Sequence, residues 1–233
     1  MEGEIDSVGL EARIRRRAGQ SRRMLGELRK AEVHLHIALD LAVDMGLREV
    51  EAETQLELGR LYRAQSRGEL AAIHFEAAQQ VADTASVEAL VDGPDWARQV
   101  AVSALEGQGI LCREAGRMEE SSVFFESALT IAGDNDLLAA QALLGLASSR
   151  HRVEDFSGAL ELLGNALEKA RAGNDRILMA RILNNTGITH HIAGRYEEAL
   201  LRYREAGDLY RSAEQPDAAL REHWLAEDWH ALA

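Results

Sequence analysis

The sequence of 233 residues contains little proline, cysteine or aromatic residue. Its only two prolines are Pro94 and Pro216, so long helices can run through most of the chain without interruption. Aromatic side chains make up 5% of the residues, and alanine and leucine must therefore fill most buried positions. This composition favours closely spaced helices over a β-sandwich. The single cysteine, Cys112, cannot form an internal disulfide, and we expect it to be buried.

Long apolar segments are absent, and lysine is rare. No apolar run approaches the length of about 18 residues that a membrane-spanning helix needs, and the N-terminus has no apolar signal-peptide core. We therefore expect a soluble, cytoplasmic protein. The chain has 2 lysines against 24 arginines, a balance that indicates a GC-rich coding sequence and a bacterial source.

The charge is acidic overall but unevenly distributed. The net charge is -13, yet residues 11–30 hold eight basic and two acidic side chains, a surplus of +6. Residues 1–10 carry -3, so the remaining 203 residues carry -16. Such an acidic body argues against a general nucleic-acid binder, because phosphates would repel it. We interpret the basic segment as the solvated face of a helix, with contact to an acidic partner or nucleic acid as the alternative.

Helical periodicity predicts pairs of helices separated by short breaks. We expect an acidic, frayed tail over residues 1–9 and then a degenerate first helix from Leu10. The segment near residues 83–95 either extends a helix or forms a loop, and its apolar residues favour the helical extension. The predicted repeats span approximately 10–46, 49–92, 95–133, 136–173 and 175–213, followed by a capping helix at 216–232.

The second helix of each predicted pair repeats one packing pattern. A small residue is followed four positions later by a large apolar residue and three positions after that by alanine. Successive triplets are offset by 40, 50, 38 and 40 residues. Small residues let two helices approach closely, and the large side chain fills the hole between them. The triplets are Ala31/Leu35/Ala38, Ala71/Phe75/Ala78, Ser121/Phe125/Ala128, Ala159/Leu163/Ala166 and Ala199/Tyr203/Ala206.

The first helices carry a matching signature. Leu58-Gly59 is followed by Tyr62, Gly109 and Gly187 keep the glycine, and Ala147 replaces it in the fourth pair. Over residues 29–213 this combination resembles tetratricopeptide repeats, in a variety whose period is near 40 instead of about 34 residues. The resemblance implies an all-α, right-handed superhelix (solenoid) of about five helix-turn-helix repeats with a C-terminal capping helix, forming one domain over residues 1–233.

The same resemblance implies a concave groove, lined by the first helices, that binds a peptide. Asn185 matches a groove asparagine that hydrogen-bonds the ligand backbone in related repeats, whereas its counterparts here are Glu57, Gly107 and Gly145. The predicted groove residues are Arg60, Arg63, Arg113, Ser148, His151, Arg181, Asn184, Asn185, Ile188 and His191.

One column of this groove consists of cations or side chains that can become cations. It contains Arg63, Arg113, His151 and His191. We therefore hypothesise an acidic peptide or carboxylate as the ligand. The alternative is that these are solvated side chains without a ligand.

The two C-terminal tryptophans have two interpretations. Trp224 and Trp229 are predicted to cap the last repeat, and the alternative is a dimer or partner contact. We expect no catalytic residues, metal or cofactor; His34 and His36, for example, project about 200° apart on a helix.

We predict a protein-interaction scaffold or adaptor that binds another protein or an acidic peptide and is not an enzyme. The alternative is a peptide- or ligand-sensing regulatory module of a bacterial signalling or transcription-control system. The oligomeric state is left open, with a homodimer through a terminal helix as one possibility.

Overall fold

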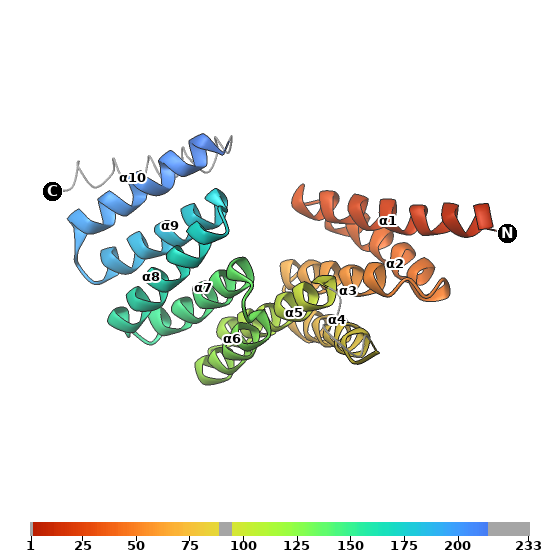
Figure 1. Ribbon diagram of the computed structural model, residues 1–233, viewed down its shortest axis with the longest axis horizontal. Coiled ribbons are helices and arrows are strands. Elements are labelled where there is room, and N and C mark those ends of the chain that lie inside the picture. Colours follow the sequence, from red (N-terminus) through yellow and green to blue (C-terminus); the bar gives the residue numbers. More distant parts are fainter. Residues whose placement is uncertain (1, 89–94, 214–233) are drawn as a thin grey trace. The chain divides into compact units, whose positions relative to one another are not determined.

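In a computed structural model, which describes residues 2–88 and 95–213, all the regular structure is α-helical (Figure 1). The predicted all-α fold of helix-turn-helix repeats is confirmed. The helices are α1 (Glu2–Met24), α2 (Leu28–Asp44), α3 (Arg48–Ala64), α4 (Gly68–Glu88), α5 (Asp95–Glu114), α6 (Met118–Ala132), α7 (Asp136–Arg152), α8 (Phe156–Ala172), α9 (Arg176–Ile192) and α10 (Tyr196–Ser212).

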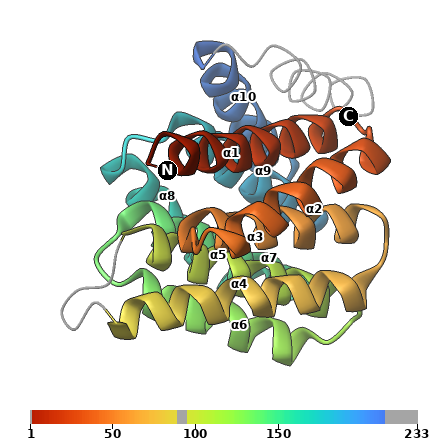
Figure 2. The same cartoon turned by 90° about the vertical axis from the view of Figure 1, so that its right-hand side faces the viewer.

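The chain divides into two compact units, Met1–Ala115 with α1 to α5 and Gly116–Ala233 with α6 to α10. In each unit, helices that follow one another in sequence pack side by side (Figures 1 and 2). The odd-numbered helices also contact one another, since α3 contacts α1 and α5, and α7 contacts α9. Within the described residues no comparable contacts join α2 to α4 or α8 to α10. The odd-numbered helices are therefore the closely spaced layer, which forms the inner side of a stack of hairpins.

The predicted triplets form the core between the two layers. Every one of their fifteen side chains is at most 2% exposed. The small residues of the odd helices lie directly against the central side chain of a triplet. A Cβ atom added to Gly59 would lie 2.7 Å from the ring of Phe75, and one added to Gly187 would lie 2.5 Å from the ring of Tyr203. Glycine is needed here for its size, because a methyl group would overlap the ring.

The first helix is in full register with the others. A Cβ atom on Gly19 of α1 would lie 2.6 Å from Cγ of Leu35, the centre of the first triplet. The same steps of 40, 50, 38 and 40 residues that separate the triplets connect the small residues of the odd helices, which are Gly19, Gly59, Gly109, Ala147 and Gly187.

The predictions for the N-terminal part were therefore partly wrong. The helix begins at Glu2, not near Leu10, and it is a complete first helix of a repeat. The buried side of α1 contains the small residues Ala12 and Gly19 instead of large apolar residues, so the helical periodicity of apolar residues is weak here.

Three further predictions concern segments at or beyond the described residues. The helical extension near residues 83–95 is confirmed as far as Glu88, where α4 ends. Residues 89–94 and the predicted capping helix at 216–232, with Trp224 and Trp229, lie outside the described residues. One domain over residues 1–233 stays a prediction. None of the described helices has both the length and the apolar character needed to cross a membrane.

Most turns between helices contain one residue with positive φ. Glycine supplies it at Gly26, Gly46, Gly116 and Gly194, where φ lies between 65° and 78°. Glu154, between α7 and α8, has φ 62° without being glycine, and this left-handed conformation disfavours any residue with a Cβ atom.

Candidate functional site

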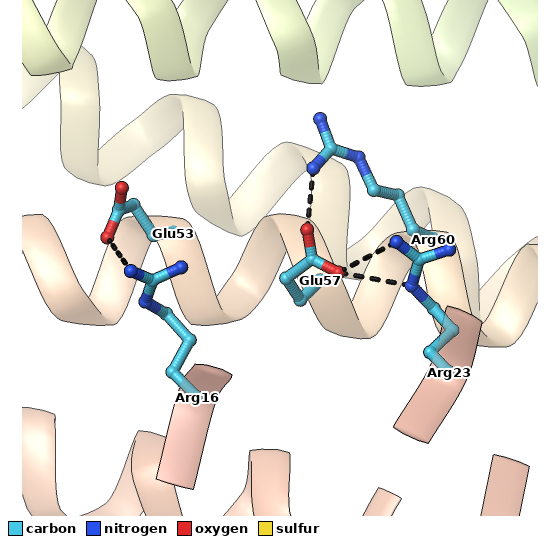
Figure 3. Close-up of polar contacts among 5 residues, drawn as sticks. All are labelled: Arg16, Arg23, Glu53, Glu57 and Arg60. Carbon is cyan, nitrogen blue, oxygen red and sulfur yellow. Dashed lines mark hydrogen bonds and ion pairs between the residues drawn. The ribbon is translucent and has the colours of Figure 1, made fainter. Parts of the chain in front are cut away.

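Arginines of α1 make ion pairs with carboxylates of α3 (Figure 3). Glu57 is only 2% exposed and lies between two arginines. Arg23 Nε of α1 donates to Glu57 Oε2 at 3.1 Å, and Arg60 Nη1 of α3 donates to Glu57 Oε1 at 2.6 Å. One helical turn earlier, Arg16 Nη2 lies 3.0 Å from Glu53 Oε2. These charges join the first helical hairpin to the second.

This arrangement departs from the predicted solvated basic face. The side chains of Arg16 and Arg23 are only 15% and 22% exposed, and both pair with α3. The sequence contains a signal for this, because the two arginines are seven residues apart on the same side of α1 as Ala12 and Gly19. Other arginines of α1 are exposed, among them Arg13 and Arg17.

A pocket of about 390 Å³ lies beside the Arg16–Glu53 pair, between α1 and α3. Burial raises the pKa of the Glu53 carboxyl above its ordinary value, although Arg16 opposes this change. Both apolar and charged side chains line the pocket. It is lined by Leu10, Arg13, Ile14, Arg16, Arg17, Glu49, Val50 and Glu53.

The predicted groove arginines of the first unit lie on α3 and α5. Arg60 pairs with Glu57, and Arg63 Nη1 lies 3.6 Å from Glu114 Oε1. The third, Arg113, is in the last turn of α5. The Arg63–Glu114 pair is long, and its side chains are 37% and 53% exposed, so it contributes at most about 1 kcal/mol.

In the second unit, His151 lies between α7 and α9. Its Nδ1 atom is 3.2 Å from Thr189 Oγ1, and its ring is tilted against that of Phe156. Burial lowers the pKa of His151 below its ordinary value, and Arg152 lowers the pKa further. His151 is therefore mainly neutral at pH 7, which does not suit a cation for an acidic ligand.

The other predicted groove residues of α7 and α9 are partly engaged within the protein. Ser148 Oγ donates to the Leu144 carbonyl at 2.8 Å, and Asn185 Nδ2 donates to the Arg181 carbonyl at 2.9 Å. Both bonds stay within one helix.

Three groove candidates of α9 have different surroundings. Ile188 packs against the buried Ala199 and Tyr203. The ring of His191 makes an edge contact with Tyr196. Asn184 Oδ1 is buried without a hydrogen-bond partner among the described residues. Of the predicted groove residues, Asn184 thus has an unused buried acceptor.

The positions equivalent to Asn185 in the other repeats, which are Glu57, Gly107 and Gly145, mainly pack against neighbouring helices. A Cβ atom on Gly107 would lie 2.6 Å from the Phe75 ring, and one on Gly145 would overlap the Phe125 ring. Glu57, the third counterpart, pairs with Arg23. These positions serve contacts between successive repeats, which explains why asparagine does not recur there.

Comparison with known families and proteins supports the repeat architecture. Residues 138–212 match a family model described as tetratricopeptide repeat. A search of curated proteins gave no match.

Solved structures with the same fold cover most of this chain. The apo form of RapI has a TM-score of 0.66 at 13% identity, and the match covers 91% of this chain and 57% of RapI. This chain thus spans just over half the length of RapI. Pseudomonas aeruginosa pilF has a TM-score of 0.61 at 14% identity, with 99% of this chain and 100% of pilF covered.

A third structure is a signal transduction ATPase from Pyrococcus horikoshii with a tetratricopeptide repeat sensor. It has a TM-score of 0.63 at 12% identity, and the match covers 95% of this chain and 37% of the ATPase. Identities this low establish the fold alone. Together with the family match over residues 138–212, they show that this chain has the fold of tetratricopeptide repeat proteins.

Proposed function

We propose that this protein is a scaffold or adaptor that binds a partner protein or peptide through the face of its odd-numbered helices. The tetratricopeptide repeat fold is in general a scaffold for protein interactions. The observation that supports this particular face is the pocket between α1 and α3, which lies within the odd-numbered layer and has both apolar and charged walls. Recognition sites for proteins and peptides commonly combine these two kinds of surface. We propose no catalytic activity.

The ligand that we propose is acidic, and its carboxylates bind Arg63 and Arg113. The Arg63–Glu114 pair is long and exposed, so a ligand carboxylate can replace Glu114 at little cost. Histidine contributes less than the sequence indicated, because burial lowers the pKa of His151.

The experiment is affinity capture from the native organism, followed by binding measurements with the partner that is identified. We expect the double variant Arg63→Glu/Arg113→Glu to lower affinity at least tenfold, because it replaces attraction by repulsion. The matched control is Arg117→Glu/Arg204→Glu, which changes net charge equally but lies before α6 and on α10. Equal affinity of the two double variants would remove this face from consideration.

The second candidate is a sensing module of a signalling or transcription-control system. It is favoured by the similarity to the Pyrococcus horikoshii ATPase, whose repeats are described as a sensor and which is much longer than this chain. A sensor responds to a small ligand, so screening peptides and metabolites for a rise in melting temperature distinguishes it from an adaptor. A bacterial source and a cytoplasmic location are part of the proposal, supported by the preference for arginine and by the single cysteine.

A further inference from the structure

The turn between α1 and α2 exposes two neighbouring large apolar side chains. Met24, the last residue of α1, is 75% exposed, and Leu25 is 76% exposed. The other exposed large hydrophobic side chains of the described residues are between 41% and 60% exposed. Single exposed apolar residues are common on protein surfaces, whereas two adjacent ones at the end of a helical hairpin mark a contact site. We call Met24 and Leu25 the apolar tip.

The repeat architecture does not require these two side chains. The steps of 40, 50, 38 and 40 residues that connect equivalent positions lead to one pair of residues in each of the other four repeats. Each of these pairs has at most one large apolar residue, so the apolar tip is particular to the first repeat. The four pairs are Ala64-Gln65, Glu114-Ala115, Arg152-Val153 and Ile192-Ala193.

The backbone fixes the conformation of this turn and leaves it open to solvent. Gly26 has φ 76°, and its N–H donates to the Arg23 carbonyl at 3.0 Å. The N–H of Glu27 donates to the Arg22 carbonyl at 2.9 Å. These two hydrogen bonds form a Schellman motif, which ends the helix at a defined place. A Cβ atom added to Gly26 would have no atom within 4 Å, so the space beside the turn is open.

Cationic side chains surround the apolar tip. Residues 22–30 contain four basic side chains and one acidic side chain, a surplus of +3. Arg23 already pairs with α3, but Arg29 and Lys30 in the first turn of α2 are exposed. No ion pair within the described residues engages Arg29, and the exposed pair of Lys30 with Glu27, at 3.1 Å, contributes little. Apolar side chains next to accessible cations are the combination that binds the surface of an anionic bilayer.

We propose that the α1–α2 turn binds an anionic lipid bilayer, with the apolar tip among the lipid headgroups and Arg29 and Lys30 on lipid phosphates. A bilayer fits this convex turn because lipids rearrange around it, whereas a protein partner must offer a matching pocket. Met24 suits such surroundings, since its flexible thioether adapts to irregular contacts. The turn is separate from the pocket between α1 and α3, which residues 10–17 and 49–53 line, so neither proposal depends on the other.

The acidic remainder of the chain limits the strength of this binding. A net charge of -13 opposes contact with an anionic surface, but only over a short range. Helices α1 and α2 run away from the turn (Figure 1) for about 35 Å and 25 Å, whereas the Debye length is about 10 Å at 0.1 M salt. Most charges of these two helices are therefore screened from the bilayer, while the cations beside the apolar tip touch it. We expect weak, reversible binding, with a partition coefficient at or below the about 10⁴ M⁻¹ of a single myristoyl chain.

The experiment is cosedimentation of the full chain with lipid vesicles at about 0.1 M salt. One set of vesicles contains phosphatidylcholine alone, and the other also contains phosphatidylglycerol as the anionic lipid. We expect the natural chain to bind the anionic vesicles at least tenfold more strongly than the neutral ones. Met24→Ser/Leu25→Ser and Arg29→Gln/Lys30→Gln are each expected to lower the partition coefficient about tenfold, because one removes the apolar contact and the other the attraction to phosphate.

Each double variant has a matched control. Val43→Ser/Ile73→Ser removes two aliphatic side chains of the same unit that are 53% and 57% exposed. Arg171→Gln/Arg176→Gln removes two exposed arginines of α8 and α9. Both controls are expected to bind anionic vesicles like the natural chain, and circular dichroism checks that every variant is folded.

Three results would overturn the proposal. The first is a natural chain that binds anionic vesicles no better than neutral ones. The second is binding that Arg29→Gln/Lys30→Gln weakens but Met24→Ser/Leu25→Ser leaves unchanged, since the turn then attracts polyanions such as nucleic acid without using its apolar tip. The third is an equal loss in the matched controls, which would place the lipid contact elsewhere on the chain.

Discussion

Replacing Glu57 by alanine breaks the most buried ion pairs between α1 and α3. Glu57 is 2% exposed and accepts hydrogen bonds from Arg23 at 3.1 Å and from Arg60 at 2.6 Å. A hydrogen bond to a charged group contributes about 1.5–3 kcal/mol. The Arg23 side chain is 22% and the Arg60 side chain 38% exposed, so water can solvate both guanidinium groups once Glu57 is removed. Solvent also screens the more exposed Arg60, so its hydrogen bond to Glu57 contributes less than this range. We expect Glu57→Ala to destabilise the first unit by about 2–4 kcal/mol.

Native-state hydrogen exchange measured by mass spectrometry locates this loss. Each stacked repeat is stabilised mainly by its contacts with the neighbouring repeats. Protection of amide hydrogens from exchange is therefore expected to fall in α1, α2 and α3 and to stay unchanged in α7 to α10. Glu57→Gln keeps the volume and one acceptor, and about half the loss is expected for it.

The matched control for this prediction is Glu114→Ala. It removes the partner of Arg63, whose pair is 3.6 Å long and exposed, and is expected to cost less than about 1 kcal/mol. If Glu57→Ala costs no more than Glu114→Ala, or if protection falls equally in both units, the assigned role of Glu57 is wrong.

Three other predictions concern packing, turn conformation and pH, and urea unfolding followed by circular dichroism measures all of them. Gly187→Ala is expected to destabilise by about 1–3 kcal/mol because its Cβ would lie 2.5 Å from the Tyr203 ring. Gly164→Ala on α8, where nothing lies within 4 Å, is expected to stabilise by about 0.5–1 kcal/mol, and equal effects of the two substitutions would contradict the packing account. Glu154→Gly, at φ 62°, is expected to stabilise by up to about 1 kcal/mol, and a loss would show that the Glu154 side chain makes a stabilising contact. Burial lowers the pKa of His74, His151 and His190 below the ordinary 6.5. As the pH falls, the unfolded chain therefore binds protons before the folded protein does, so the free energy of unfolding is highest above about pH 6.5 and declines below it. A free energy of unfolding that stays constant between about pH 7.5 and 5.5 would contradict this prediction.

The repeat architecture was predictable because it depends on residue size at fixed spacing. The triplets and the glycines of the odd helices follow one register, and all five triplets are buried. The one exception to alanine at their ends, Ser121, is explained by its hydrogen bond to Ser149 of α7, with 2.9 Å between the hydroxyl oxygens. A single sequence does not show such a pairing between residues 28 positions apart.

The role of the arginines in α1 was harder to predict. Arg23 pairs with Glu57, 34 residues away, and periodicity does not distinguish a buried charge from a solvated one. Gly19 carried the missing signal, since it lies 40 residues before Gly59, the same step as between the first two triplets. Once Gly19 is recognised, Arg16 and Arg23 fall on the inward side of α1.

The column that contains Asn185 shows a different limit of reasoning from sequence. Asn185 belongs to the same register as Gly107 and Gly145, but those glycines contact the aromatic ring of the preceding repeat. Register along the chain identifies equivalent positions, whereas the spacing between successive repeats decides whether a position faces a neighbour or a ligand.

The central claim is that the odd-numbered helices form the partner-binding face. Hydrogen exchange of the protein alone and in complex with its captured partner tests this most directly. We expect new protection in odd-numbered helices, with the strongest effect around the pocket between α1 and α3. Protection confined to the even-numbered helices, with none in α3, α5, α7 or α9, would contradict the claim.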